Sequence, residues 1–107
     1  MSDALRWFPI PHPSTLRFDP GAAITVAGVE LAIFPLGDAY VALVNSCPHA
    51  GGPLAEGYRD GNRIECAWHG WSFDLATGAC QQVPKRPARR VPLRERDGQY
   101  EVALPLP

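Results

Sequence analysis

The sequence lacks any long apolar run. No stretch approaches the roughly 20 apolar residues that a membrane-spanning helix needs. Residues 1–14 carry charges and three prolines in place of the continuous apolar segment of a signal peptide. We therefore expect a protein that does not associate with membranes and is located in the cytoplasm.

The sequence also lacks an excess of charge and a paired set of cysteines. Its 10 Lys and Arg residues nearly balance its 11 Asp and Glu residues, which argues against nucleic acid as a partner. The cysteine count is 3, so a disulfide framework would leave one thiol over. This favours a reducing compartment, in which the cysteines serve another purpose.

No segment has the length and spacing of a helix, whereas 10 glycines and 12 prolines punctuate short β-branched and aromatic runs. This pattern predicts an all-β chain, and 107 residues suffice for one domain, residues 1–107. We expect three hairpins with strands at Val29–Leu36 and Tyr40–Asn45, at Tyr58–Arg59 and Arg63–Glu65, and at Val91–Arg96 and Gln99–Leu104. Pro35 should lie at an edge or near a strand end, because proline cannot donate to a sheet ladder.

Two short segments combine a thiolate with an imidazole. Cys47 and His49 are two residues apart, Cys66 and His69 are three apart, and residues 58–65 between the segments have the length of a hairpin. Such a hairpin could bring the two loops face to face and gather four metal-binding side chains. Thiolate and imidazole suit an iron–sulfur cluster or zinc.

A mononuclear zinc site is the main competing interpretation. Two cysteines and two histidines are a familiar zinc set, but zinc sites usually place the cysteines together and the histidines together. The alternation of Cys and His in this chain argues for a different centre.

At these residues the sequence resembles the Rieske family, whose pattern C-x-H followed downstream by C-x-x-H is met by Cys47, His49, Cys66 and His69. The flanking segments CPHAGGPL and CAWHGWSFDLATG are also similar to those of Rieske-type ferredoxins. The resemblance implies one [2Fe–2S] cluster per chain, with the cysteines on an inner iron and the histidines on an outer one. It also implies an antiparallel β-sandwich or barrel with a cluster-binding lobe over roughly residues 46–84.

The sequence departs from the Rieske proteins of quinol-oxidising complexes at four positions. Gly52 and Trp68 stand where those proteins carry a bridging pair of cysteines, and Trp71 and Phe73 stand where they place serine and tyrosine hydroxyls against the cluster. Hydrogen bonds to cluster sulfurs stabilise the reduced state. Without the two hydroxyls, we expect a low reduction potential.

The resemblance implies an electron carrier that takes electrons from a ferredoxin reductase and passes them to a terminal oxygenase. A catalytic oxygenase also needs an iron held by two histidines and a carboxylate, and only His12 is left of the 3 histidines. We therefore expect a monomeric protein that is not itself an enzyme. A small Rieske-like subunit of a larger reductase, such as a nitrite reductase, is the alternative.

Further residues have more than one interpretation. For Cys80 we favour a packed small side chain over a redox-active thiol or an extra ligand. Lys85–Arg90 could be a docking patch for an acidic partner or, as we slightly favour, a solvated loop. Trp68 is expected to shield the second ligand segment, and Pro84 resembles a residue that covers the cluster in the family.

Overall fold

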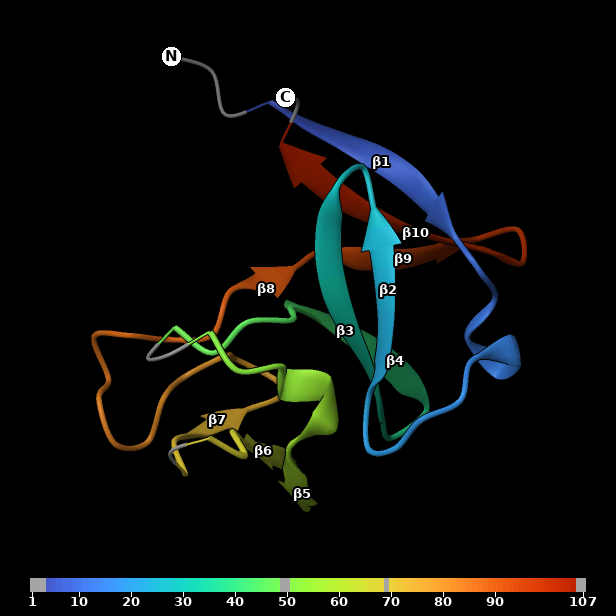
Figure 1. Cartoon of the computed structure of the whole chain (residues 1–107). Coiled ribbons are helices and arrows are strands. Elements are labelled where there is room, and N and C mark those ends of the chain that lie inside the picture. The colour runs from blue at the N-terminus through green and yellow to red at the C-terminus, as the bar shows by residue number, and fades with distance from the viewer. Residues whose placement is uncertain (1–3, 49–50, 69, 106–107) are drawn as a thin grey trace.

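The computed structural model describes residues 4–48, 51–68 and 70–105, and these residues form an almost entirely β structure (Figure 1). The strands are β1 (Leu5–Ile10), β2 (Ala22–Val26), β3 (Val29–Leu36), β4 (Ala39–Val44), β5 (Tyr58–Asp60), β6 (Arg63–Glu65), β7 (Ser72–Asp74), β8 (Arg90–Val91), β9 (Leu93–Arg96) and β10 (Gln99–Pro105). Two 3-10 turns, η1 (Pro13–Thr15) and η2 (Leu54–Glu56), are the helices of this part of the chain. Neither turn is long enough to span a membrane.

The strands form three antiparallel sheets with the orders β1-β10-β9, β2-β3-β4-β8 and β5-β6-β7. The first two sheets make the larger body of the molecule. The third sheet lies at one end of β3 and β4, together with the loops on either side of it (Figure 1). We call residues 46–89 the small lobe.

Strands β3 and β4 separate two apolar cores. Leu31 and Ile33 of β3 pack with side chains of β1, β8 and β10. Ala32 and Phe34 face the small lobe. Leu43 of β4 also faces the lobe. Because successive side chains of a strand point to opposite faces, a strand buried on both faces must be apolar throughout. This explains why the two runs show no alternation of polar and apolar residues.

The C-terminal hairpin is confirmed. Arg96 pairs with Gln99, and the two residues between them, Asp97 and Gly98, have φ values of 51° and 81°. Positive φ at both positions is the requirement of a type I′ turn, which Asp-Gly satisfies. The buried hairpin of β3 and β4 is also confirmed, and Pro35 lies next to the end of β3 as expected.

The hairpin of β5 and β6 forms where the sequence predicts it, but β5 extends one residue beyond the predicted Arg59, to Asp60. Asp60 pairs with Arg63, so the turn residues are Gly61 and Asn62. Gly61 has a φ of 60°. Glycine is the preferred residue for positive φ at the first position of such a turn, and this sets the register.

The predicted strand Val91–Arg96 is wrong as a single element. Pro92 divides it into β8, which pairs with β4, and β9, which pairs with β10. A proline has no N–H to continue a ladder, so the chain leaves one sheet at this residue and enters another. Strands β1 and β2 are not predicted by the patterns above, and β1 contains Pro9, which is tolerated because β1 is an edge strand.

A leucine-to-alanine substitution should loosen a different part of the molecule in each of the two cores. We expect Leu43→Ala and Leu31→Ala each to lower the free energy of unfolding by about 2–5 kcal/mol, because both side chains are fully buried. Local amide exchange should then increase within residues 51–75 for Leu43→Ala and within β1 and β10 for Leu31→Ala. Hydrogen exchange read by mass spectrometry checks this, and the same exchange pattern in both variants would contradict two separate cores.

Candidate metal centre

The two cysteines of the candidate centre lie in loops on either side of the β5–β6 hairpin. Cys47 follows β4 and begins the first ligand loop, residues 47–53. Cys66 follows β6 and begins the second ligand loop, residues 66–71. Both cysteines are buried, with 2% and 1% of their surfaces exposed, and both belong to the apolar core of the small lobe.

Each of the two ligand loops is closed by two backbone hydrogen bonds, and the pattern is the same in both loops. The N–H of Cys47 donates to the carbonyl of Gly52 at 2.8 Å, and the N–H of Gly51 donates to the carbonyl of Cys47 at 2.7 Å. Two equivalent bonds, of 2.7 and 2.9 Å, close the second loop from Cys66 to Trp71. Each loop therefore folds back on its own cysteine over five residues.

A glycine with positive φ makes each closure possible. Gly51 has a φ of 80° and Gly70 a φ of 74°, and each is the fourth residue after its cysteine. A residue with a side chain would be strained in this conformation. The glycines of the two motifs therefore fix the shape of the loops.

The two loops touch at Gly52. A Cβ atom added there would lie 2.9 Å from Cys66 Sγ and 2.9 Å from Trp68 Cδ2, closer than side-chain carbons normally come. Gly52 and Trp68 are thus neighbours, at the positions that the sequence resemblance matches to the bridging cysteines of quinol-oxidising complexes. The indole of Trp68 packs on this glycine while 57% of the residue stays exposed, which agrees with the predicted shielding of the loop.

The other two candidate ligands, His49 and His69, lie outside the described residues. In the described part of the chain, no three His, Cys, Asp or Glu side chains gather as a metal site. The described residues nevertheless bring the two halves of the motif together, since Cys66 is in contact with the first ligand loop. The structure thus confirms the predicted convergence of the loops and does not test the histidines.

Two anchors hold the first ligand loop and the lobe, and no motif marks either of them. Asn45, at the end of the apolar run of β4, is 5% exposed, and its Oδ1 accepts a 2.8 Å hydrogen bond from the N–H of Ala55. Arg59 of β5 donates to the carbonyl of Pro35 at 2.5 Å and so connects the lobe to β3. A polar residue that ends an otherwise apolar strand is the signal that could have identified Asn45.

Cys80 lies in the core of the small lobe and is 3% exposed. Its Sγ accepts a 3.4 Å hydrogen bond from the N–H of Val83. Val83 begins a segment with Pro84 and Pro87, residues 83–89, which we call the proline loop. Cys80 is thus a packed thiol at the base of that loop, in agreement with its predicted structural interpretation.

The basic residues of the proline loop and β8 are exposed: Lys85, Arg86, Arg89 and Arg90. The ion pair seen among the described residues joins Arg94 and Glu101, on the larger body of the molecule. The four cations are thus exposed to solvent without a described carboxylate as partner.

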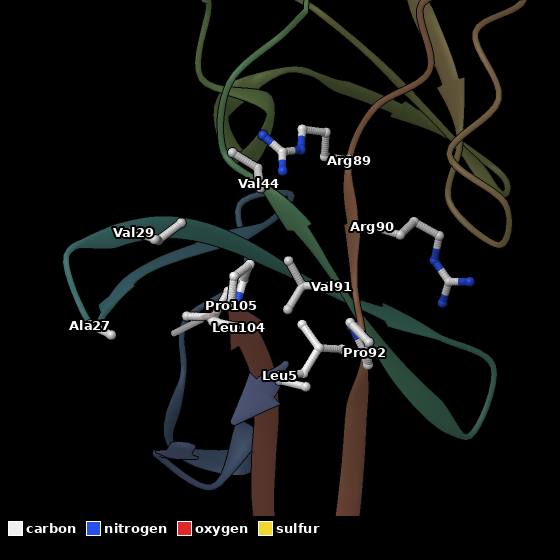
Figure 2. Close-up of a pocket in the computed structure, with 11 residues that line it drawn as sticks. Leu5, Ala27, Val29, Val44, Arg89, Arg90, Val91, Pro92, Leu104 and Pro105 are labelled. Atoms are coloured by element: carbon white, nitrogen blue, oxygen red, sulfur yellow. The ribbon is translucent and has the colours of Figure 1, made fainter. Parts of the chain in front are cut away.

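A pocket of about 550 Å³ lies away from the ligand loops, between the two larger sheets (Figure 2). Its walls are mostly apolar, with Leu5, Val91 and Leu104 among them, and Arg89 and Arg90 also line it. The guanidinium group of Arg90 points away from the apolar side chains in Figure 2. None of the described residues of the two ligand loops lines this pocket, which lies apart from Cys47 and Cys66.

The described geometry fits a cluster held between the two loops. Each loop contributes one buried cysteine, and glycine at position 52 lets the loops approach within side-chain contact. Soft thiolate ligands in an apolar setting suit an iron–sulfur cluster. Fold and loops together define an all-β domain with a two-loop metal centre.

Comparison with known proteins identifies the family. Residues 6–100 match the Rieske [2Fe-2S] domain. The anthranilate 1,2-dioxygenase ferredoxin subunit of Burkholderia cepacia is 34% identical over 97 residues, which are 90% of this chain and 90% of that protein. A ferredoxin solved in complex with the oxygenase of carbazole 1,9a-dioxygenase has a TM-score of 0.78 at 27% identity, over 94% of this chain and 96% of that one.

The methylxanthine N1-demethylase NdmA of Pseudomonas putida is 36% identical over 90 residues, which are 84% of this chain but 24% of the demethylase. The chain therefore spans about a quarter of the length of that relative. It belongs to the Rieske [2Fe-2S] domain family. Membership implies one [2Fe–2S] cluster and decides against the zinc interpretation.

The contact at Gly52 can be tested. We expect Gly52→Ala to lower the stability of the folded protein by about 1–3 kcal/mol, because the new methyl group overlaps Cys66 Sγ and Trp68. It should also reduce the cluster content per chain, measured as iron and acid-labile sulfide. Gly61→Ala in the same lobe is the control, since its φ is also positive but a Cβ there has open space. Equal cluster loss in both variants would contradict a role for the loop contact.

Proposed function

We propose that this chain is a Rieske-type ferredoxin, a one-electron carrier that accepts electrons from a reductase and passes them to a terminal oxygenase. The observation that carries the proposal is the match to a dioxygenase ferredoxin subunit over 90% of both chains. The complex of a similar ferredoxin with its oxygenase supports an oxygenase as the acceptor. The protein's part in this function is to set the potential and the exposure of its cluster.

We propose Cys47, His49, Cys66 and His69 as the four cluster ligands. The burial of the two cysteines supports them as ligands of the inner iron. The equal closure of the two loops supports one cysteine and one histidine from each loop. By this assignment His49 and His69 would hold the outer iron, past which electrons would enter and leave.

A catalytic oxygenase is the function that the relatives offer as an alternative, because the demethylase contains a domain similar to this chain. The mononuclear iron of such enzymes needs two histidines and a carboxylate. The sequence has 3 histidines, and the cluster takes two. His12, which remains, bonds to Ser14 in its own turn. We therefore assign no catalysis to this chain.

We further propose that residues 1–107 form one domain with a cluster-binding lobe at roughly residues 46–84. Two separate but adjoining cores, which share β3 and β4 as a common wall, support this assignment. We propose a monomer in a reducing, cytoplasmic compartment. Cys66 and Cys80 are free thiols in the described structure, as such a compartment allows.

The function is tested first by the spectroscopy of the purified protein. We expect a red-brown protein with two irons per chain and a Rieske electron paramagnetic resonance signal after reduction with dithionite. Cys66→Ser should lose the cluster, whereas Cys80→Ser should retain it, because Cys80 is equally buried but serves packing. A colourless wild-type protein loaded with zinc would overturn the proposal, and a stable complex with a reductase on co-purification would favour the subunit alternative.

The reduction potential is a second prediction. Phe73 is fully buried and has no hydroxyl to donate to the cluster, and Trp71 has none either. We therefore expect a midpoint potential below 0 mV, in the lower part of the roughly −150 to +300 mV range of Rieske centres. Redox titration followed by visible absorption measures it. A midpoint well above 0 mV would be that of a quinol-oxidising protein and would contradict the carrier assignment.

The exposed cations provide a test of docking. We expect the double variant Arg89→Glu and Arg90→Glu to slow electron transfer with the partner, and to do so more at low than at high salt, because salt screens exposed charges. Stopped-flow kinetics over a series of salt concentrations measures this. The control variant, Arg17→Glu with Arg96→Glu, reverses two exposed charges outside the small lobe. Equal electron-transfer rates for the two variants would show that the basic residues form a solvated loop and not a docking patch.

A further inference from the structure

Gln82 connects the second ligand loop with the base of the proline loop. Its Oε1 accepts a 2.9 Å hydrogen bond from the N–H of Ser72. Its Nε2 lies 3.5 Å from the carbonyl of Gly70 and 3.3 Å from Ser72 Oγ, and donates to both. One side-chain amide thus binds the backbone on both sides of Trp71, at Gly70 and at Ser72.

These bonds continue a β-ladder by means of a side chain. Phe73 and Cys80 form an antiparallel bridge, and the N–H of Gln81 donates to the carbonyl of Ser72 at 2.9 Å. In a regular antiparallel ladder the Ser72 N–H would donate in return to the Gln81 carbonyl. Gln82 Oε1 takes that place instead.

The chain leaves the ladder at this point because the proline loop begins. The N–H of Val83 turns to Cys80 Sγ, and Pro84 follows without an N–H. The backbone after Gln81 therefore cannot supply another rung next to the second ligand loop. Ser72 is 8% exposed, and a buried N–H without a partner is costly, so the side chain of Gln82 meets a real requirement.

We propose that Gln82 is a positioning residue of the iron–sulfur centre, whose side-chain amide fixes the backbone of residues 70–72 and thereby the potential of the cluster. The inference rests on the ligand set proposed above. The positioning role follows from where Gln82 binds: Gly70 comes directly after the proposed ligand His69, and Ser72 begins β7. A loop held at both points keeps its backbone dipoles in one arrangement around the metal, and such arrangements tune cluster potentials.

Gln82→Met tests the proposal, because methionine is similar in length but offers no comparable hydrogen bond. We expect amide exchange within residues 70–74 of the holoprotein to become about 5- to 10-fold faster, since a net hydrogen bond is worth roughly 1 kcal/mol. We also expect a lower midpoint potential and a changed electron paramagnetic resonance line shape. Exchange is read by mass spectrometry and needs no activity measurement.

Gln81→Met is the matched control. The side chain of Gln81 accepts hydrogen bonds from Arg63 at 2.5 Å and from Ser72 Oγ at 3.2 Å, but it bonds to no backbone atom of the described residues of the second ligand loop. This variant should keep the wild-type potential, line shape and exchange in residues 70–74. If Gln81→Met and Gln82→Met shift the potential equally, the proposal is overturned.

Gln82→Glu is a second variant in case Gln82→Met does not fold. Its carboxylate can accept from the Ser72 N–H but cannot donate to the Gly70 carbonyl, so exchange at Ser72 should stay within about threefold of wild type. Fast exchange in this variant, or a Gln82→Met protein with lower thermal stability but unchanged potential and line shape, would overturn the positioning role. A wild-type protein without a Rieske signal would instead refute the proposed function, and the exchange data would still report on the Gln82 bonds.

Discussion

The metal centre depends on the close approach of the two ligand loops at Gly52. Since a single methyl group there would overlap Cys66 Sγ and Trp68, the facing loops have no room for any side chain at this position. The rest of the lobe serves this approach: the β5–β6 hairpin returns the chain beside the first loop, and a glycine with positive φ closes each loop on its own cysteine. In the Rieske proteins of quinol oxidation a disulfide joins the loops at these positions. Here glycine and tryptophan pack in its place.

The lobe is held in turn by a wall that it shares with the larger body. Strands β3 and β4 are buried on both faces, so each contributes to two cores, and a change on one face need not disturb the other. Polar anchors supplement this packing where the lobe meets the wall. Asn45, directly after β4, accepts a hydrogen bond from η2 across the first ligand loop, and Arg59 fixes β5 to the end of β3. Buried hydrogen bonds of this kind add modest net stability but specify one arrangement of the loops.

The sequence predicts those parts of the fold that local chemistry determines. Asp97-Gly98 is a strong hairpin signal, and the structure shows positive φ at both residues. Ala27-Gly28 makes the same kind of turn between β2 and β3, with φ values of 50° and 81°, yet alanine gives no such signal, so this hairpin was not predicted. At the site, the cysteines can be recognised in the sequence because each lies two or three residues before a histidine, a spacing that indicates metal ligands. Gln82 cannot, because its role arises from where the proline loop leaves the ladder, and only tertiary structure shows that.

The relatives show that one cluster domain serves two kinds of protein. It forms nearly all of a ferredoxin subunit and about a quarter of a demethylase. In this chain the thiols of Cys47 and Cys66 are buried in the core of the small lobe, whereas Trp68 of the second ligand loop is exposed. Such an asymmetry suits electron exchange, because the buried side retains the cluster while the exposed side can approach a partner. A carrier needs nothing more than this and a surface for docking, whereas an oxygenase needs a second iron with its own histidines. The 3 histidines of this sequence include the two of the Rieske pattern, which the first role requires.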